Sequence, residues 1–115
     1  VQCVHGEIFD VIVDTRINSR SYSKWYSTIL NPESNKALFI PKGCAHAFLS
    51  LKENSIVSYL IEGEFKQNYS SSFFWNDPML NINWPIDNPI LSEKDSKAQS
   101  FESYMKSRVE NNHKK

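Results

Sequence analysis

Apolar and polar residues alternate with period two through most of the first 80 or so positions, and turn-forming residues interrupt the alternation at short intervals. This pattern is typical of strands that bury one face, and the short spacing favours an all-β sandwich or barrel. It predicts strands over residues 1–4, 7–14, 24–30, 36–40, 46–51 and 55–61, with a weaker one near 72–75. Turn residues such as those at 41–43 and 53–54 lie between the strands.

The pattern changes after Trp75. Prolines at 78, 85 and 89 punctuate an extended segment without a regular period. Ser92 and Asp95 then have the spacing of a capping box, which predicts that a helix begins there. One apolar stripe at helical spacing follows, formed by Phe101, Tyr104, Met105 and Val109. We therefore predict a single domain over 1–115, with strands in 1–75, an extended arm over 76–96 and a helix over 97–111.

Composition narrows the function classes. The 115 residues carry 13 Lys+Arg and 13 Asp+Glu, and this zero net charge argues against a nucleic-acid or membrane-surface binder. No apolar run approaches the roughly 18 residues of a membrane span and no signal peptide is visible, so a cytoplasmic location is expected. Cys3 and Cys44 form no CxxC pair and are expected to be small buried residues. The start at Val1, within a strand pattern, favours a fragment of a longer protein.

The segment 41–46 (PKGCAH) carries the most informative short motif. P-x-G-x-x-H is typical of the second half-motif of the cupin jelly roll, in which a tight turn places a His at the start of an inward-facing strand. Period two puts His46, Phe48 and Ser50 on one face. The alternative is a hydrogen-bonded structural histidine. A cupin metal site also needs an HxH pair and a Glu on an earlier strand. The sequence before His46 offers no such pair, so we expect no metal.

Six blocks carry a wider resemblance, in order and properly spaced over residues 1 to about 96. They are residues 9–16 (FDVIVDTR), 24–25 (KW), 38–48 (LFIPKGCAHAF), 75–78 (WNDP), 82–85 (INWP) and 91–95 (LSEKD). They resemble the blocks of the dTDP-4-dehydrorhamnose 3,5-epimerase family. The resemblance implies an all-β cupin jelly roll (a double-stranded β-helix) with a short C-terminal helix. It also implies a homodimer that acts on a nucleotide sugar, usually in deoxysugar synthesis for surface polysaccharide.

The resemblance also implies chemistry for individual residues. Inverting a carbon next to a ketone needs a base, an acid on the opposite face and a partner for the enolate. In the family these are a His paired with a carboxylate, a Tyr and a Lys, and no metal or organic cofactor takes part. Tyr59 matches the acid and Asp95 the carboxylate, while His46 and Lys94 match substrate-binding positions. The alternatives are a core aromatic for Tyr59, and for Asp95 a carboxylate that only favours a helix N-terminus.

The chain departs from the family pattern at several points. The family's basic His belongs to an R-G-L-H-Y-Q block and its Lys to a G-K-L block, and both precede the position that matches Val1. His5, expected in a turn, is a poor substitute, and Ala47 and Leu60 replace the family's Gly and Lys. The predicted function is 3,5-epimerisation of a nucleotide-activated 4-keto-6-deoxy sugar, with this fragment impaired or inactive. The alternative is a non-catalytic sugar-nucleotide-binding or structural cupin.

Overall fold

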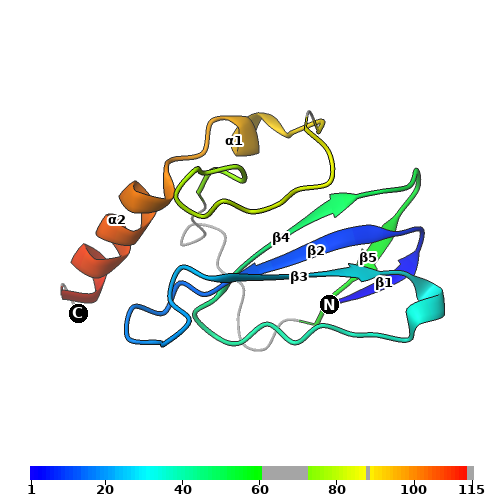
Figure 1. The fold of residues 1–115 in the computed structure, drawn as a ribbon, viewed down its shortest axis with the longest axis horizontal. Helices are drawn as coiled ribbons and strands as arrows, with labels where there is room; N and C mark the ends of the chain where they lie inside the picture. The colour runs from blue at the N-terminus through cyan, green and yellow to red at the C-terminus, as the bar shows by residue number, and fades with distance from the viewer. Residues whose placement is uncertain (61–72, 88, 114–115) are drawn as a thin grey trace. The chain divides into compact units, whose positions relative to one another are not determined.

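The computed structural model describes residues 1–60, 73–87 and 89–113. The chain forms two compact units, Val1–Phe65 and Lys66–Lys115. The first unit contains all the named strands and one 3-10 helix, and the second contains two α-helices (Figure 1). The elements are β1 (Gln2–His5), β2 (Ile8–Val13), β3 (Trp25–Leu30), η1 (Pro32–Ser34), β4 (Ala45–Ser50), β5 (Ile56–Ser58), α1 (Glu93–Ser96) and α2 (Phe101–His113).

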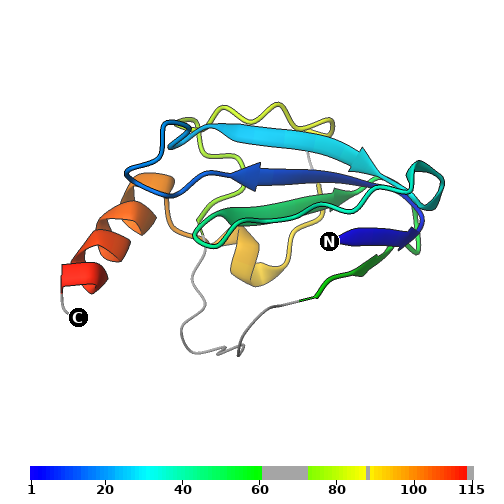
Figure 2. The ribbon, with the colours of Figure 1, turned by 90° about the horizontal axis from the view of Figure 1, so that it is seen from below.

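The strands of the first unit form two antiparallel sheets. One has the order β3-β2-β4, so that β2 is central, and the other pairs β1 with β5. Figure 2 shows β1 and β5 beside one another, apart from the three-stranded sheet. Five of the strands predicted from the alternation are therefore confirmed, each within a few residues of its expected bounds, and residue 61, the predicted end of the last one, lies outside the described residues. His5 is the last residue of β1 rather than a turn residue.

The strand predicted over residues 36–40 is wrong, because this segment forms no ladder. Among the described residues, Leu38 alone in this segment pairs with another backbone: its N–H donates to the Val1 carbonyl (2.7 Å), and the Val1 amino group donates to the Leu38 carbonyl (2.8 Å). Leu38 packs inward, whereas Phe39 is 80% exposed. The segment thus has the alternation of a strand but a single paired residue, which does not make one.

The core of the first unit lies where the two sheets face each other. Cys3 of β1, Ile8 of β2 and Leu30 of β3 are buried there, and Val57 of β5 packs against them. Cys3 and Val57 are directly opposite in the β1–β5 pair, so both point to the same side. This cluster closes one end of the inner face of the three-stranded sheet.

The second unit is held by a carboxylate at a helix start. Asp77 is buried, and its oxygens accept from the N–H groups of Phe101 (2.8 Å) and Met79 (2.9 Å). The first of these bonds satisfies an N–H that the first turn of α2 leaves unpaired. Phe101 and Met105 are buried together with Leu80 among the apolar residues of this unit, as the predicted stripe requires. Val109 lies in α2, but its side chain is outside the described ones.

The helix predicted over 97–111 is observed as α2, which begins four residues later, and a separate short helix, α1, lies in the predicted arm. Ser92 does cap a helix, since its hydroxyl accepts from the Asp95 N–H (3.1 Å), but α1 ends at Ser96 and α2 begins only at Phe101. The weak strand expected near 72–75 is reduced to an isolated bridge between Phe73 and Gln99, and residue 72 is outside the described residues. No helix in the described part of the chain has the length and apolar character that crossing a membrane requires.

Candidate functional site

A buried carboxylate bonded to a histidine lies on the inner face of the three-stranded sheet. Asp10 Oδ1 and His46 Nε2 are 2.6 Å apart, with Asp10 fully buried and the His46 side chain 22% exposed. The register explains this contact: Ile12 is opposite His46 and Asp10 is opposite Phe48, so Asp10 and His46 are diagonal neighbours on one face. The P-x-G-x-x-H motif therefore places its histidine as predicted, on the same face as Phe48.

Asp10 is the functional candidate that the sequence reasoning missed. It lies within the block FDVIVDTR, which carries the family resemblance but assigns no role to this carboxylate. The available signal was the alternation itself, since a lone acidic residue occupies an inward position between Ile8 and Ile12. A carboxylate at such a position has to find a hydrogen-bond donor, because burying it unpaired is costly.

The pair sets which atoms are left for a ligand. A carboxylate only accepts hydrogen bonds, so Nε2 of His46 is the donor and Nδ1 is the ring nitrogen that Asp10 does not use. Asp10 Oδ2 is buried and has no hydrogen-bond partner among the described residues. Because Oδ2 is buried, Nδ1 of the partly exposed His46 is the atom of the pair that can bind a polar group of a ligand.

The inner face changes character along the sheet. At one end of this face, the cross-strand neighbours Leu30 and Ile8 are buried in the core. The next cross-strand pair on the same face is Asp10 with Phe48. Phe48 is exposed, and its ring centroid is 6.0 Å from that of His46. Beyond these buried residues, the polar ring of His46 thus lies beside the aromatic ring of Phe48, and polar groups next to an aromatic surface are the usual composition of a small-molecule site.

The turn before His46 is fixed to the end of β2. The Thr15 hydroxyl donates to the Gly43 carbonyl, and Thr15 itself is almost fully buried. Gly43 has a φ of 92°, a conformation that glycine adopts without strain. The P-x-G part of the motif therefore has a physical role, because this turn sets where β4 begins.

The carboxylate of Asp14, next to Thr15, accepts hydrogen bonds from several residues of the loop that follows β2. It accepts two bonds from the Arg16 guanidinium (3.0 Å each) and one from the Ser19 hydroxyl (2.7 Å), and it is also bonded by Ser21. Arg16 above all, with help from the two serines, holds the pKa of Asp14 well below its usual range, although burial acts in the opposite direction. The Cys44 sulfur is 3.9 Å from Asp14 Oδ1, and burial raises the pKa of this thiol.

Tyr59 follows β5 directly and is 60% exposed, so the structure does not bury it as the core aromatic of the alternative reading. Within residues 1–60, no hydrogen bond joins Tyr59 to His46 or Asp10. Asp95 and Lys94 lie in α1 of the second unit, where Asp95 is exposed and the Lys94 side chain is outside the described ones. The roles of Tyr59, Lys94 and Asp95 stay predictions.

Among the residues that the structure describes, no three His, Cys, Asp or Glu side chains are grouped so that they could hold a metal ion.

Comparison with known proteins gives a consistent result. The family model for dTDP-4-dehydrorhamnose 3,5-epimerase matches residues 1–103. The epimerase of that name from Sinorhizobium fredii is 40% identical over 102 residues, which are 88% of this chain and 52% of the relative. The one from Shigella flexneri is 39% identical over 101 residues, which are 88% and 56%. The chain spans about half the length of the curated relatives it matches.

Solved structures agree with the fold. An epimerase from Mycobacterium tuberculosis superposes with a TM-score of 0.89 at 35% identity, covering 94% of this chain and 56% of that one. The epimerase from Bacillus anthracis, with TDP and PPi bound, gives 0.84 at 38% identity, covering 87% and 57%. The predicted all-β jelly roll with a short C-terminal helix is confirmed by these similarities.

Replacing Asp14 with Asn should destabilise the protein by about 1–3 kcal/mol at pH 7, because several bonds to a charged group are lost. The native pKa of Asp14 is lowered, so its contribution is complete above about pH 4 and is lost as the pH falls toward the native pKa. Urea unfolding should therefore show the gap between wild type and Asp14→Asn narrowing from pH 5 to pH 2. Asp87→Asn, at an exposed carboxylate, serves as the control. Equal pH dependence in wild type and Asp14→Asn would contradict the assignment.

The Asp10–His46 geometry predicts a proton on Nε2 of His46. Nitrogen-15 NMR of the imidazole should show Nε2 protonated, with a slowly exchanging N–H signal that disappears in Asp10→Asn or His46→Gln. The exposed His5 gives an internal comparison, since its ring should lack such a signal. A His46 ring with an unprotonated Nε2 would show that the hydrogen bond is not formed as described.

Proposed function

Since this chain belongs to the dTDP-4-dehydrorhamnose 3,5-epimerase family, we propose that the protein epimerises a nucleotide-activated 4-keto-6-deoxy sugar at C3 and C5. The observation that carries the proposal is the buried Asp10 bonded to the partly exposed His46, on an inner face that lies within the family match. Two neighbouring structures support the ligand class: the Bacillus anthracis protein binds TDP and PPi, and one from Legionella pneumophila binds dTDP-4-keto-L-rhamnose.

The proposed reaction moves protons and no other atoms. The C4 ketone makes the hydrogens on C3 and C5 acidic, so a base can remove one and leave an enolate with its charge on the ketone oxygen. An acid then returns a proton to the opposite face of the same carbon, which inverts it. Substrate and product are isomers, and the largest electrostatic demand is for a donor near the enolate oxygen.

His46 and Asp10 suit the recognition of a substrate oxygen. The Asp10 carboxylate accepts the hydrogen bond from Nε2 and so fixes the orientation of the ring, which leaves Nδ1 to accept a hydrogen bond from a substrate hydroxyl. Because Asp10 is fully buried, water does not compete for this bond. We assign His46 to substrate binding and Asp10 to positioning it.

The remaining roles rest on the family pattern. Tyr59 is proposed as the acid, and its exposure leaves the phenol available for proton transfer. Asp95 is proposed to orient the base and Lys94 to bind substrate. The base itself belongs to an R-G-L-H-Y-Q block that these 115 residues do not contain. The chain would thus contribute the acid and the binding groups of the complete active site, in a cytoplasmic protein.

A chimaera tests the catalytic part of the proposal. When this chain replaces the matching segment of the Sinorhizobium fredii relative, dTDP-4-keto-6-deoxyglucose in D₂O should gain deuterium at C3 and C5, followed by NMR. Tyr59→Phe should slow incorporation by about 10²–10⁴-fold, as expected for loss of a general acid. Tyr104→Phe, a matched change in α2, should have no effect.

The chain alone provides the second arm of this test. It should bind the same nucleotide sugar saturably without incorporating deuterium. Incorporation by the chain alone would reveal a base within the 115 residues. A folded chimaera that binds but never exchanges would instead support the non-catalytic sugar-nucleotide-binding cupin, and a chain that does not bind would remove the proposed function.

We also propose a homodimer. Among the described strands, β3 and β4 are the outer strands of the three-stranded sheet, so each has an edge without a strand partner. Such edges are usually covered, and a second copy is one way to cover them. Light scattering should therefore give the mass of two chains. A stable monomer at high concentration would contradict the dimer.

A further inference from the structure

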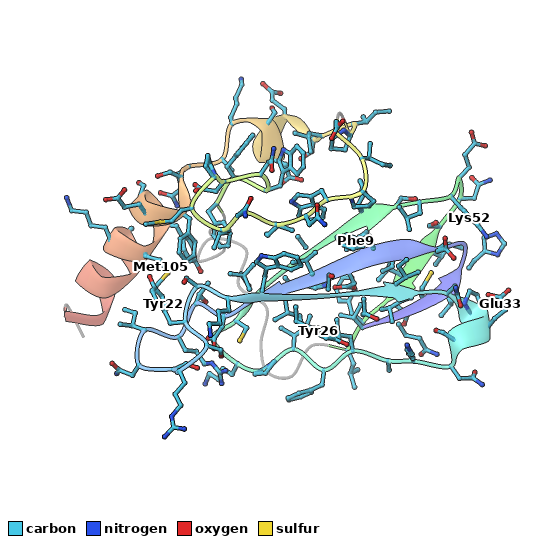
Figure 3. The ribbon with its side chains drawn as sticks, viewed as in Figure 1. Phe9, Tyr22, Tyr26, Glu33, Lys52 and Met105 are labelled. Atoms are coloured by element: carbon cyan, nitrogen blue, oxygen red, sulfur yellow. The ribbon has the colours of Figure 1, made fainter. Side chains whose placement is uncertain are left out.

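Tyr26 lies on the same sheet face as His46, on the far side of the central strand. Ile12 of β2 is directly opposite Tyr26 of β3 and directly opposite His46 of β4, so the three side chains form one row across the sheet. Figure 3 labels Tyr26 and Phe9, which point to opposite sides of this sheet, as their registers require. Tyr26 therefore belongs to the face that carries the Asp10–His46 pair.

The exposure of Tyr26 contrasts with the burial of Leu30 on the same face. Leu30, four residues further along the same strand and on the same side, is 1% exposed, whereas Tyr26 is 60% exposed. Within the described residues, the Tyr26 side chain makes no hydrogen bond or ring contact with another residue. Tyr26 thus presents an exposed aromatic ring and hydroxyl on the same face as the Asp10–His46 pair, which is typical of a residue that contacts a ligand and not of a core residue.

The separation of the two side chains suits a sugar ring. Neighbouring strands lie about 4.8 Å apart, so the backbones of β3 and β4 are roughly 10 Å apart across β2. A hexose ring of roughly 5 Å, with a hydrogen bond of about 2.8 Å on each side, has a similar span. Ile12, half-buried between them, offers an apolar surface to the methyl group of a 6-deoxy sugar.

We propose that Tyr26 is a specificity-determining residue that contacts the hexose from the side opposite His46. The phenol can donate to or accept from a sugar hydroxyl, and its ring can pack against the C–H face of the sugar. This inference rests on the proposed function and adds to it: Tyr26 reads the sugar and not the nucleotide. Its removal therefore weakens binding of the nucleotide sugar and leaves binding of the nucleotide unchanged.

Calorimetric titrations of the chain with dTDP and with dTDP-4-keto-6-deoxyglucose test this directly. Tyr26→Phe should weaken binding of the nucleotide sugar about 3–10-fold, the range expected for one hydrogen bond, and leave dTDP binding unchanged. Tyr26→Val, which also removes the ring, should weaken it further. Ile29→Val is the matched control, because Ile29 is an exposed residue of the same strand on the opposite face.

Each outcome separates the possibilities. If both Tyr26 variants bind the nucleotide sugar as tightly as the wild type, the assignment of Tyr26 is wrong while the proposed function stands. Equal losses for dTDP and the nucleotide sugar, or a Tyr26→Phe variant with a clearly lowered melting temperature, would make Tyr26 a structural residue and overturn the assignment. A wild-type chain that binds neither ligand would overturn both proposals.

Discussion

The hydrogen bond between the Asp10 carboxylate and the His46 imidazole is the interaction on which the rest of the described site depends. A carboxylate without solvent contact has to be bonded to a donor, and removing the partner of such a buried pair typically costs about 3–5 kcal/mol. Here the donor comes from a strand 36 residues later in the chain. The pair therefore fixes how β4 lies against β2 and the direction in which the histidine ring points.

The segment that follows Asp10 fixes the other end of the same strand pair. Thr15 binds the turn that precedes β4, and Asp14 gathers the guanidinium and hydroxyl groups of the loop after β2. Residues 10–15 thus hold β4 at its start and along its side. The histidine needs no contact from a mobile loop to be positioned, because rigid strands place it.

Much of this architecture could be predicted from the alternation of apolar and polar residues, because every second side chain of a strand lies on the same face of the sheet. Where the prediction was wrong, the missing information was a partner. Residues 36–40 alternate correctly, yet within the described part of the chain only Leu38 pairs with another backbone. In the second unit, the capping box at Ser92 was real, but helical spacing alone could not show that the helix stops at Ser96.

Asp10 belongs to a block that resembles the family pattern, and the sequence of that block does not show which of its residues has a function. Only the register between β2 and β4, which places Asp10 beside His46, identifies its role. Tyr26 has no sequence signal at all.

The 36-residue separation between Asp10 and His46 has a kinetic consequence. The β2–β3 pair closes a short loop, whereas joining β4 to β2 requires the closure of a much longer one, whose entropy must be lost before any contact forms. During synthesis from the N-terminus, Asp10 emerges from the ribosome 36 residues ahead of His46. The carboxylate then remains in water, where its charge is well solvated. Dehydration of Asp10 and formation of the ligand-binding face are consequently the same late event, so a partly folded chain has no half-built site with which to capture a sugar.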